Sequence, residues 1–529
     1  MVPSETFVPS MYITQALHRA VQQVPARVAV RFKDRQRTFI EYADRVARLA
    51  GALQALGMRP GDRVAMLALN SDRYLEYQMA VLWGGGVLNP CNTRWSAKEI
   101  LYALDDSGSS ILLVDDAFED HVAQFRREST CLREVIHCGE GEVPTGMHGY
   151  EQLLLQHAPV PDALRRGDDL AGIFYTGGTT GFPKGVMLSH ANMCASALSV
   201  YSDEVVHDDG TYLHVAPMFH LADMGFAHAQ WFASATHAIL PSFEPESLLD
   251  TLERDRVTSV LLVPTMIQML VDHPAIRKPR DLSALKTIIY GASPISEALI
   301  ERVMDVLPAV SFVQGYGMTE LSPIATLNGA YHHSREGRKL GKLSSAGRAA
   351  RCMEVRIVDA NDREVPRGTV GEVVVRGPNV MLGYWNQPEL TAQAVRDGWM
   401  HTGDGAWMDE DGFVFIADRM KDMIVSGGEN VYSGEVENAI ARHPAVAACA
   451  VIGIPDDRWG ETVHAVVVAK AGTEVTIDEL IAHCRELIAG YKCPRSVAFV
   501  DTLPLSGAGK VLKAQLREPF WRGRTRRVA

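Results

Sequence analysis

The pattern of hydrophobic and polar positions divides the chain into regions of different texture. Residues 40–350 alternate between stretches with helical spacing and short apolar runs. The stretch 40–56 has helical spacing, whereas RVAMLAL (63–69), SSILLVDD (109–116) and VTSVLLVP (257–264) have the composition of buried strands. Helices that alternate with apolar strands are typical of parallel sheets covered by helices, so the fold class predicted for this region is α/β.

The pattern of predicted elements changes beyond about residue 350. The sequences MEVRIVDANDREV, GEVVVRG and GFVFIADR predict short strands joined by turns, and therefore a β-rich subdomain at about 350–418. After residue 422 we expect a small α+β unit with strands near 446–454 and 463–469. Its helix should begin at Thr476-Ile477-Asp478-Glu479, where Thr and Glu have the spacing of a capping box.

The charged run from Asp418 to Asp422 marks the expected boundary between the two parts. We therefore predict a large N-terminal domain over residues 1–418, a hinge over 419–422 and a small mobile C-terminal domain over 423–529. A chain of 529 residues is long enough for several packing units.

Composition and charge narrow the class of protein. The formal net charge of −12 argues against a nucleic-acid-binding surface. The eight cysteines form no CxxC pair, which favours a reducing, cytoplasmic location. The N-terminus does not have the pattern of a signal peptide, and we expect no transmembrane segment because polar residues or proline interrupt the longest apolar runs. A homodimer is possible, but the sequence does not decide the oligomeric state.

The segment YTGGTTGFPKG (175–185) concentrates glycines, threonines and one lysine. Bare N–H groups, hydroxyls and an ammonium can converge on a phosphate, although a structural turn would have a similar composition. A Walker loop has Gly before its Lys and Ser or Thr after it, but Lys184 lies between Pro183 and Gly185. The apolar flanks predict strand–loop–strand, with a helix that begins only near Ser189.

Four further stretches carry candidate chemistry: GYGMTE (315–320), HTGD (401–404), DRMKDMIVSGGEN (418–430) and LSGAGKVLK (505–513). Each alone has a structural explanation. Thr319-Glu320 could begin a helix, Asp404 could cap a tight turn, and Lys510 could be a solvated loop lysine. Together, in this order, the five segments closely resemble the acyl-adenylate-forming superfamily of acyl-CoA synthetases, adenylation domains and luciferases. The resemblance extends from about residue 12 to residue 517.

The resemblance implies an ATP-dependent acyl-CoA synthetase that forms an acyl-AMP and then a CoA thioester. ATP, Mg²⁺ and CoA are the expected cofactor and co-substrates. The implied catalytic residues are Lys510, Thr176, Glu320 and His220, with Glu320 and Thr176 also as the magnesium ligands. The implied residues for ATP and CoA are Thr176, Gly177, Gly178, Thr179, Thr180, Lys184, Gly291, Ala292, Ser293, Gly315, Tyr316, Gly317, Met318, Thr319, Asp404, Arg419, Lys421, Gly427, Gly428, Glu429 and Lys510.

Among these, the resemblance assigns particular roles to a few. Tyr316 should lie against adenine, Asp404 should accept the ribose hydroxyls, and Lys510 should reach the carboxylate and α-phosphate. Lys421 is implied as the hinge, and Gly427-Gly428 as the wall of the pantetheine channel.

The segment APMFHLADMGF (216–226) bears on the carboxylic acid substrate. Amino-acid-activating members of the superfamily have an aspartate where this chain has His220, which disfavours an α-amino acid, although Asp223 lies three residues on. His220 is either beside the substrate carboxylate or a buried structural histidine. His214, His228 and His237 lack metal-like spacing and are interpreted as structural.

The expected pocket residues are mostly apolar: Leu221, Met224, Phe226, Gly291 and Gly315. They favour a medium- to long-chain fatty acid, with an aryl or arylpropenoic acid as the alternative. Two other hypotheses remain open at this point. The enzyme could deliver its acyl group to a carrier protein or stop at acyl-AMP, or the chain could be a non-catalytic nucleotide-binding relative.

Overall fold

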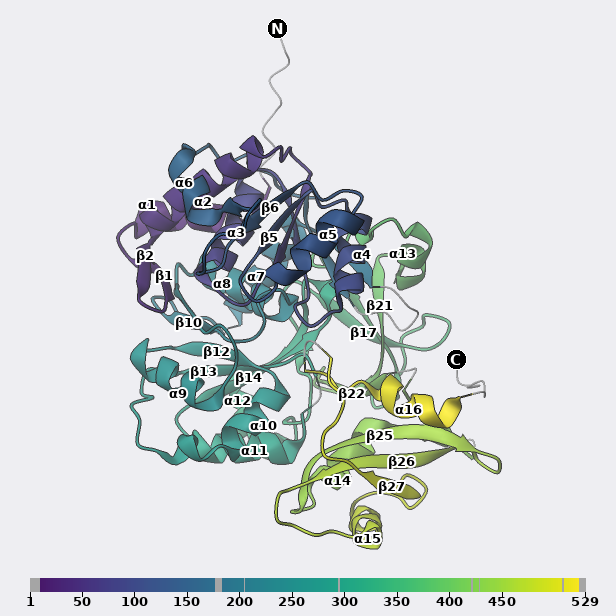
Figure 1. Ribbon diagram of the computed structural model, residues 1–529. Coiled ribbons are helices and arrows are strands. Elements are labelled where there is room, and N and C mark those ends of the chain that lie inside the picture. The colour runs from purple at the N-terminus through teal and green to yellow at the C-terminus, as the bar shows by residue number, and fades with distance from the viewer. Residues whose placement is uncertain are drawn as a thin grey trace.

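The computed structural model describes residues 10–176, 183–203, 205–293, 295–419, 422–427, 429–506 and 509–522. Four β-sheets with helices packed on them form the molecule, and the C-terminal sheet lies apart from the other three (Figure 1). The predicted fold class is confirmed: parallel-rich sheets covered by helices, a β-rich subdomain and a C-terminal α+β domain. The boundary at 419–422 stays a prediction, since Met420 and Lys421 lie outside the described residues.

The first large sheet is parallel from β14 to β1 and has antiparallel strands at both ends. Its strands, in spatial order, are β16 (Arg348–Ala349), β15 (Ile324–Asn328), β14 (Ser311–Gly317), β13 (Thr287–Gly291), β12 (Ser259–Leu262), β10 (Thr211–His214), β11 (Thr236–Ile239), β1 (Val28–Phe32) and β2 (Arg35–Thr38). The apolar run VTSVLLVP contains β12, as predicted.

The second large sheet is parallel from β8 to β7, with two antiparallel strands after β8. Its strands are β19 (Gly383–Tyr384), β9 (Lys184–Ser189), β8 (Leu170–Thr176), β4 (Val87–Pro90), β3 (Arg63–Leu67), β5 (Ile111–Val114), β6 (Glu134–His137) and β7 (His148–Gly149). The predicted strand–loop–strand is therefore β8 and β9, on either side of the glycine-rich segment.

The β-rich subdomain is an antiparallel sheet, consistent with its short strands and many turns. It contains β17 (Glu354–Val358), β18 (Gly371–Arg376), β20 (Val395–Arg396), β21 (Trp399–Met408) and β22 (Val414–Arg419). The C-terminal domain contains β23 (Ile424–Ser426), β24 (Glu429–Val431), β25 (Val446–Asp456), β26 (Gly460–Ala469) and β27 (Ser496–Phe499). Its two long strands, β25 and β26, match the predicted strands.

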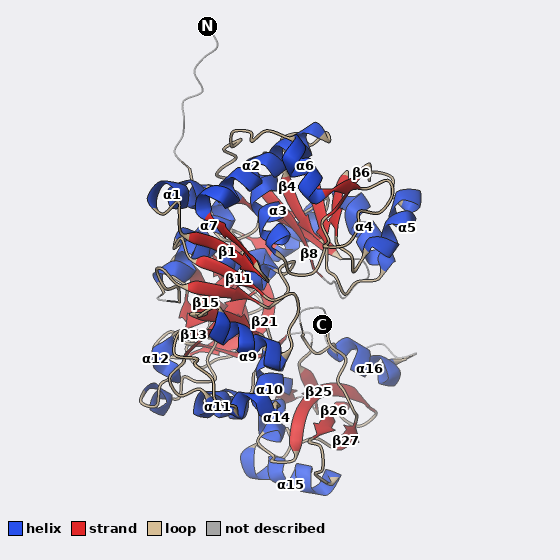
Figure 2. Ribbon diagram, turned by 60° about the vertical axis from the view of Figure 1, so that its left-hand side comes forward, coloured by secondary structure: helices blue, strands red, loops and turns tan. Residues whose placement is uncertain are grey.

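Helices cover the faces of the two large sheets, as Figure 2 shows. The N-terminal helices are α1 (Gln15–Gln23), α2 (Phe39–Ala55), α3 (Asp72–Trp83), α4 (Ala97–Ser107), α5 (Val122–Glu128), α6 (Tyr150–Gln156), α7 (His190–Ser202), α8 (Leu221–Phe232), α9 (Pro245–Arg254), α10 (Pro264–Asp272), α11 (Glu297–Val306), α12 (Ala330–His333) and α13 (Pro388–Ala394). Short 3₁₀ turns are η1 (Glu119–His121), η2 (Pro274–Arg277), η3 (Thr319–Leu321) and η4 (Gly337–Leu340).

The C-terminal domain carries α14 (Ser433–Ala441), α15 (Ile477–Leu487) and α16 (Lys513–Trp521). The predicted capping box is present at α15: Thr476 Oγ1 accepts the Glu479 N–H at 3.2 Å, and Glu479 accepts the Thr476 N–H at 2.8 Å. These reciprocal bonds satisfy donors that a helix start leaves unpaired.

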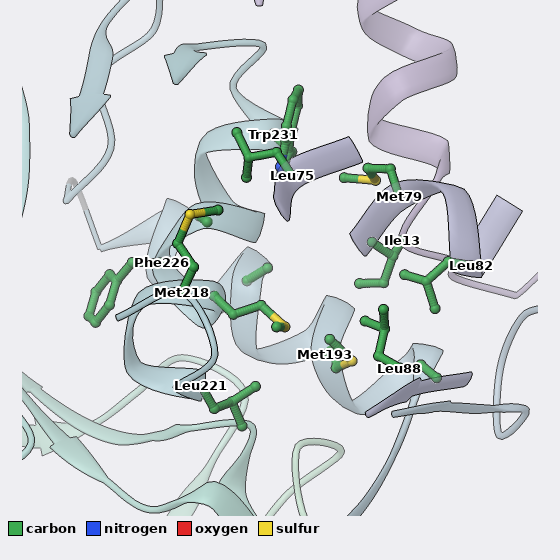
Figure 3. Close-up of a cluster of buried hydrophobic side chains, with 14 of the residues drawn as sticks. Ile13, Leu75, Met79, Leu82, Leu88, Met193, Met218, Leu221, Phe226 and Trp231 are labelled. Carbon is green, nitrogen blue, oxygen red and sulfur yellow. The ribbon is translucent and has the colours of Figure 1, made fainter. Parts of the chain in front are cut away.

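The hydrophobic cores explain why the C-terminal domain is a separate unit. One continuous cluster of buried side chains joins both large sheets and the β-rich subdomain. Figure 3 shows part of this cluster, with Leu75, Met193 and Trp231 among its members. The C-terminal domain packs around its own cluster, which includes Ile424, Val451, Leu480 and Cys484. Its contacts with the larger domain include polar bonds, such as the Arg442–Glu297 ion pair at 3.0 Å. A domain with its own core can move as a unit without exposing apolar surface from another core.

Candidate active site

The two flanks of the glycine-rich segment are held close together. β8 ends at Thr176 and β9 begins at Lys184, and these two residues are Cα partners in the antiparallel ladder. Gly177, Gly178, Thr179 and Thr180 lie outside the described residues. The structure therefore places both ends of the predicted phosphate-binding segment at one point of the second sheet.

Asp106 fixes these flanks from the end of α4. Its carboxylate accepts the Tyr175 hydroxyl at 2.6 Å, and its backbone carbonyl accepts the Trp385 indole N–H at 2.8 Å. The backbone N–H of Trp385 donates to the Gly185 carbonyl at 2.7 Å. A Cβ on Gly185 would approach Ile173 Cγ2 to 2.7 Å, so this packing requires glycine.

The C-terminal ends of β13 and β14 approach one another closely. A Cβ on Gly291 would lie 2.1 Å from the Gly315 carbonyl oxygen, and one on Gly317 would lie 1.9 Å from the Pro323 carbonyl. The chain then turns at Ala292, which has a φ of 64°, and continues to Ser293. Ligands of open α/β sheets bind outside the carboxyl ends of the strands, which is where these residues lie.

Asp404 joins two elements that are distant in sequence. Its carboxylate accepts the Tyr316 hydroxyl at 2.8 Å and pairs with Arg419 Nε at 3.1 Å. Asp404 and Arg419 face each other across the β21–β22 ladder, and burial and the Tyr316 contact leave Asp404 only 7% exposed. The predicted proximity of Arg419 to Asp404 is thus present.

The expectation of a tight turn at HTGD is wrong, because these residues lie inside strand β21. Gly403 has a φ of 70°, and the register with β18 shifts beside it, so its special conformation belongs to a β-bulge. The Gly403 N–H donates to the Glu372 carboxylate at 2.9 Å. A bulge re-aims the side chain that follows it, here Asp404.

Glu320 lies in η3, directly after β14, and is 6% exposed. Its Oε1 accepts the Tyr384 hydroxyl at 2.8 Å, and Lys184 Nζ lies over the Tyr384 ring, 5.2 Å from its centroid. The sequence analysis missed Tyr384, although an aromatic pair follows a glycine in GYW (383–385). Tyr384 links Glu320 to the lysine that follows the glycine-rich segment.

Lys510 lies inside this group rather than in solvent. Burial and the Arg419 charge lower the pKa of its ammonium to about 8, and the nearby carboxylates of Asp404 and Glu320 partly oppose them. The interpretation of Lys510 as a solvated loop lysine is therefore wrong for this arrangement. A lysine held here supplies a cation that deprotonates near neutral pH.

His220 precedes α8 and caps its first turn. Its Nδ1 accepts the Ala222 N–H at 3.1 Å, so the neutral ring carries its proton on Nε2. Burial and the Lys510 charge lower the pKa of His220 to about 4, which keeps the imidazole neutral at pH 7. The predicted pocket residues Leu221, Met224 and Phe226 follow on α8 and are all buried. Figure 3 labels Leu221 and Phe226.

Gly315 faces the same side chains. A Cβ at this position would lie 3.2 Å from Ile324 Cδ1 and 3.3 Å from Phe226 Cζ. Even a methyl group would therefore displace these neighbours by a few tenths of an ångström. The placement of Gly315 next to Phe226 agrees with its predicted place beside the pocket residues.

Asp223 is buried and hydrogen-bonded inside the protein core. Its carboxylate bonds to His214 Nδ1 at 2.6 Å and accepts the Tyr212 hydroxyl at 3.2 Å. His214 Nε2 lies 2.9 Å from His237 Nδ1, and the His237 ring stacks on Trp231. Since this carboxylate is paired internally, it does not support an α-amino substrate. The buried His228, whose pKa burial lowers to about 3, agrees with the structural interpretation.

The predicted CoA residues lie in the C-terminal domain. Gly427, with a φ of 64°, donates its N–H to the Trp459 carbonyl at 2.8 Å, and Glu429 begins β24. Gly428 and the predicted hinge residue Lys421 lie outside the described residues. The proximity of Gly427 and Glu429 to pantetheine stays a prediction.

Comparison with known proteins identifies the family. Residues 17–385 match the AMP-binding enzyme family, and residues 435–510 match the AMP-binding enzyme C-terminal domain. The chain belongs to the AMP-binding enzyme family. It is 42% identical over 504 residues to a feruloyl-CoA synthase of an Amycolatopsis species, covering 95% of this chain and 98% of the relative.

Two further relatives agree with this assignment. A fatty acid–[acyl-carrier-protein] ligase, ScoC of Streptomyces coeruleorubidus, is 35% identical and covers 96% of each chain. The crystal structure of ATP-bound MatB from Rhodopseudomonas palustris superposes with a TM-score of 0.87 at 30% identity, covering 97% of this chain and 100% of MatB.

The AMP-binding enzyme described here is an AMP-forming CoA ligase that uses ATP, Mg²⁺ and CoA. A carboxylate and a hydroxyl offer the hard oxygen ligands that Mg²⁺ prefers, so the chemistry of Glu320 and Thr176 fits the ion. Their role as its ligands stays a prediction. No helix in the described part of the chain has both the length and the apolar character that crossing a membrane requires.

Proposed function

We propose that this enzyme activates an apolar carboxylic acid, with an arylpropenoic acid as the best-supported class, and transfers it to CoA. The observation that carries the catalytic assignment is the convergence of Lys510, Asp404, Arg419 and Glu320 with His220. These residues come from β14–η3, β21, β22, the start of α8 and the C-terminal domain.

In the first half-reaction, a carboxylate oxygen attacks the α-phosphorus of ATP, and the bond to the pyrophosphate oxygen breaks. Two anions must approach, and negative charge gathers on the phosphoryl oxygens. The Lys510 ammonium would stabilise that charge, and Asp404 would accept the ribose hydroxyls. Bound Mg²⁺ would neutralise phosphate charge, with Glu320 and Thr176 as its protein ligands.

His220 would orient the substrate carboxylate. Its neutral ring has an Nε2–H available for donation, because Nδ1 already accepts from the α8 backbone. A neutral donor holds a carboxylate without adding a second buried cation beside Lys510. Burial of His220 keeps its ring neutral, and a neutral N–H donor suits a carboxylate substrate that lies next to a lysine.

In the second half-reaction, the CoA thiol attacks the acyl carbonyl and AMP leaves. We infer that the C-terminal domain swings about residues 419–422, which removes Lys510 and brings Gly427 and Gly428 toward the thiol. The separate core of the C-terminal domain supports this motion, because the movement breaks polar contacts rather than a shared apolar core.

The substrate class rests on similarity and on the pocket residues. The sequence analysis ranked a fatty acid first, whereas the relative with 42% identity is a feruloyl-CoA synthase. We therefore place an arylpropenoic acid first.

A medium- to long-chain fatty acid remains the second candidate, because ScoC is a fatty acid ligase and is 35% identical. ScoC also supports transfer to an acyl-carrier protein as the alternative acceptor. The two acceptors differ in the thiol, not in the adenylation step.

The test is a panel of acids, namely ferulic, 4-coumaric, octanoic and palmitic acid, assayed with ATP, Mg²⁺ and either CoA or holo-acyl-carrier protein. The proposal predicts AMP, pyrophosphate and a CoA thioester, with the highest kcat/KM for the arylpropenoic acids. A higher kcat/KM for palmitic acid would select the second candidate. Pyrophosphate release without an acid requirement would overturn the assignment.

A further inference from the structure

Ser506 is hydrogen-bonded to the backbone of Gly509 and of Lys510. The Ser506 N–H donates to the Lys510 carbonyl at 2.7 Å, and Ser506 Oγ accepts the Lys510 N–H at 3.1 Å. The Ser506 carbonyl accepts the Gly509 N–H at 2.9 Å. These bonds fix the backbone of Lys510 relative to Ser506, so whatever holds Ser506 also places Lys510.

Arg94, 412 residues earlier in the chain, reaches Ser506 from the large domain. Its Nη1 donates to the Ser506 carbonyl at 3.1 Å. Arg94 follows β4 in a turn that is itself well held: its N–H donates to Asn92 Oδ1 at 3.0 Å, and α4 starts at a capping box formed by Ser96 and Glu99. The backbone that carries Arg94 is therefore held in place by hydrogen bonds. The Arg94 guanidinium contacts the Ser506 carbonyl across the domain interface.

The opposite side of the segment rests on the large domain as well. A Cβ on Gly509 would lie 3.0 Å from Thr265 Oγ1 and 3.4 Å from Val263 Cγ2, at the start of α10. Gly509 has a φ of 76°, a conformation that glycine adopts without strain. Ser506 thus contacts the β4–α4 turn through Arg94, and Gly509 lies against the start of α10.

We propose that Arg94 is a positioning residue for the adenylation step, which holds Lys510 in the active site by docking Ser506. The inference rests on the proposed role of Lys510 in the first half-reaction. Because Arg94 bonds to the backbone carbonyl of Ser506, it holds the backbone next to Lys510 and leaves the Lys510 side chain free for the reactants. When the C-terminal domain moves for the second half-reaction, the bond must break, and Arg94 contributes nothing to thioester formation.

The Arg442–Glu297 ion pair also crosses between the domains, at 3.0 Å. Its side chains are 50% and 35% exposed; Arg442 directly follows α14, and Glu297 begins α11. Exposed ion pairs of this kind contribute little and are screened by salt. Arg94, by contrast, is bonded to Ser506, the residue that holds the backbone of Lys510.

The test compares Arg94→Ala with two other variants. Arg94→Lys keeps a cationic donor but replaces the guanidinium fork with a single ammonium. Arg48→Ala removes an arginine of α2 with the same kind of bond, Nη1 to the His157 carbonyl at 3.1 Å, within the large domain. Two rates are measured with the best acid of the panel: acid-dependent pyrophosphate release, and thioester formation from supplied acyl-AMP and CoA.

Arg94→Ala should slow pyrophosphate release by about threefold to tenfold, the effect of losing one exposed hydrogen bond. Thioester formation should stay at the wild-type rate or rise, Arg94→Lys should recover part of the loss, and Arg48→Ala should leave both rates unchanged. Hydrogen exchange of the peptide that contains Ser506 and Lys510 should be faster in Arg94→Ala without any substrate present.

Equal losses in both half-reactions, or unchanged exchange and unchanged pyrophosphate release, would overturn the proposal. The Lys510→Ala variant separates the two levels of the argument. If Lys510→Ala lacks pyrophosphate release while Arg94→Ala is normal, the positioning role fails and the proposed function stands. If Lys510→Ala is itself normal, the proposed function of the lysine fails.

Discussion

Replacing Lys510 by alanine should separate the two half-reactions of the enzyme. In the structure, burial and Arg419 lower the pKa of the ammonium to about 8, so the group is mostly charged at pH 7. Removing one preorganised charge donor from a buried transition state costs about 3–4 kcal/mol, or roughly 10²- to 10³-fold in rate. Lys510→Ala should therefore slow acyl-AMP formation by that factor.

The same variant should convert supplied acyl-AMP and CoA to thioester at nearly the wild-type rate, because the thiol attacks after Lys510 has left the site. The assays are acid-dependent pyrophosphate release and thioester formation from synthetic acyl-AMP. Lys470→Ala is a matched control: this lysine lies in the same domain and bonds to the Pro444 carbonyl at 2.6 Å. Equal losses of both activities in Lys510→Ala would refute the alternation of domains.

Three further predictions follow from the same geometry. Tyr384→Phe removes the 2.8 Å hydrogen bond to Glu320 and should raise the Mg²⁺ concentration that gives half-maximal pyrophosphate release, as measured by Mg²⁺ titration. Thioester formation from acyl-AMP should not change. An unchanged Mg²⁺ requirement would contradict the role of this hydrogen bond. Gly315→Ala should lower kcat/KM for ferulic acid more than for a short aliphatic acid, because the added Cβ would lie 3.3 Å from Phe226 Cζ. If the ratio of kcat/KM for the two acids stayed the same, Gly315 would not be part of the acid-binding site. The wild-type adenylation rate should fall as pH rises through about 8, because Lys510 loses its proton there. If the Lys510→Ala variant showed the same fall in rate above pH 8, Lys510 would not be the group that causes it.

Local signals predicted much of the fold. Glycines and threonines between two apolar runs indicated a loop between strands, and β8 and β9 occupy those runs. The Thr476–Glu479 spacing located the start of α15, because a capping box is a contact between residues three apart. Periodicity and capping depend on neighbours in sequence, so one sequence suffices to read them.

Contacts between distant residues could not be read in the same way. Tyr384 meets Glu320 from 64 residues away, and Arg94 meets Ser506 from 412 residues away. Asp223 could have faced a substrate amine, and only the packing of α8 on β10 shows that it bonds to His214. Gly403 was interpreted as part of a turn because a bulge and a turn require the same positive φ.

The central claim, an acyl-adenylate formed by attack of the carboxylate on the α-phosphorus, can be tested by isotope transfer. The preferred acid is labelled with ¹⁸O in both carboxylate oxygens and incubated with ATP, Mg²⁺ and CoA, and the released nucleotide is analysed by mass spectrometry. The account predicts AMP that carries one ¹⁸O, since the oxygen that joins phosphorus to the acyl group stays with AMP when the thiol attacks. Unlabelled AMP, or ADP as the nucleotide product, would contradict the account.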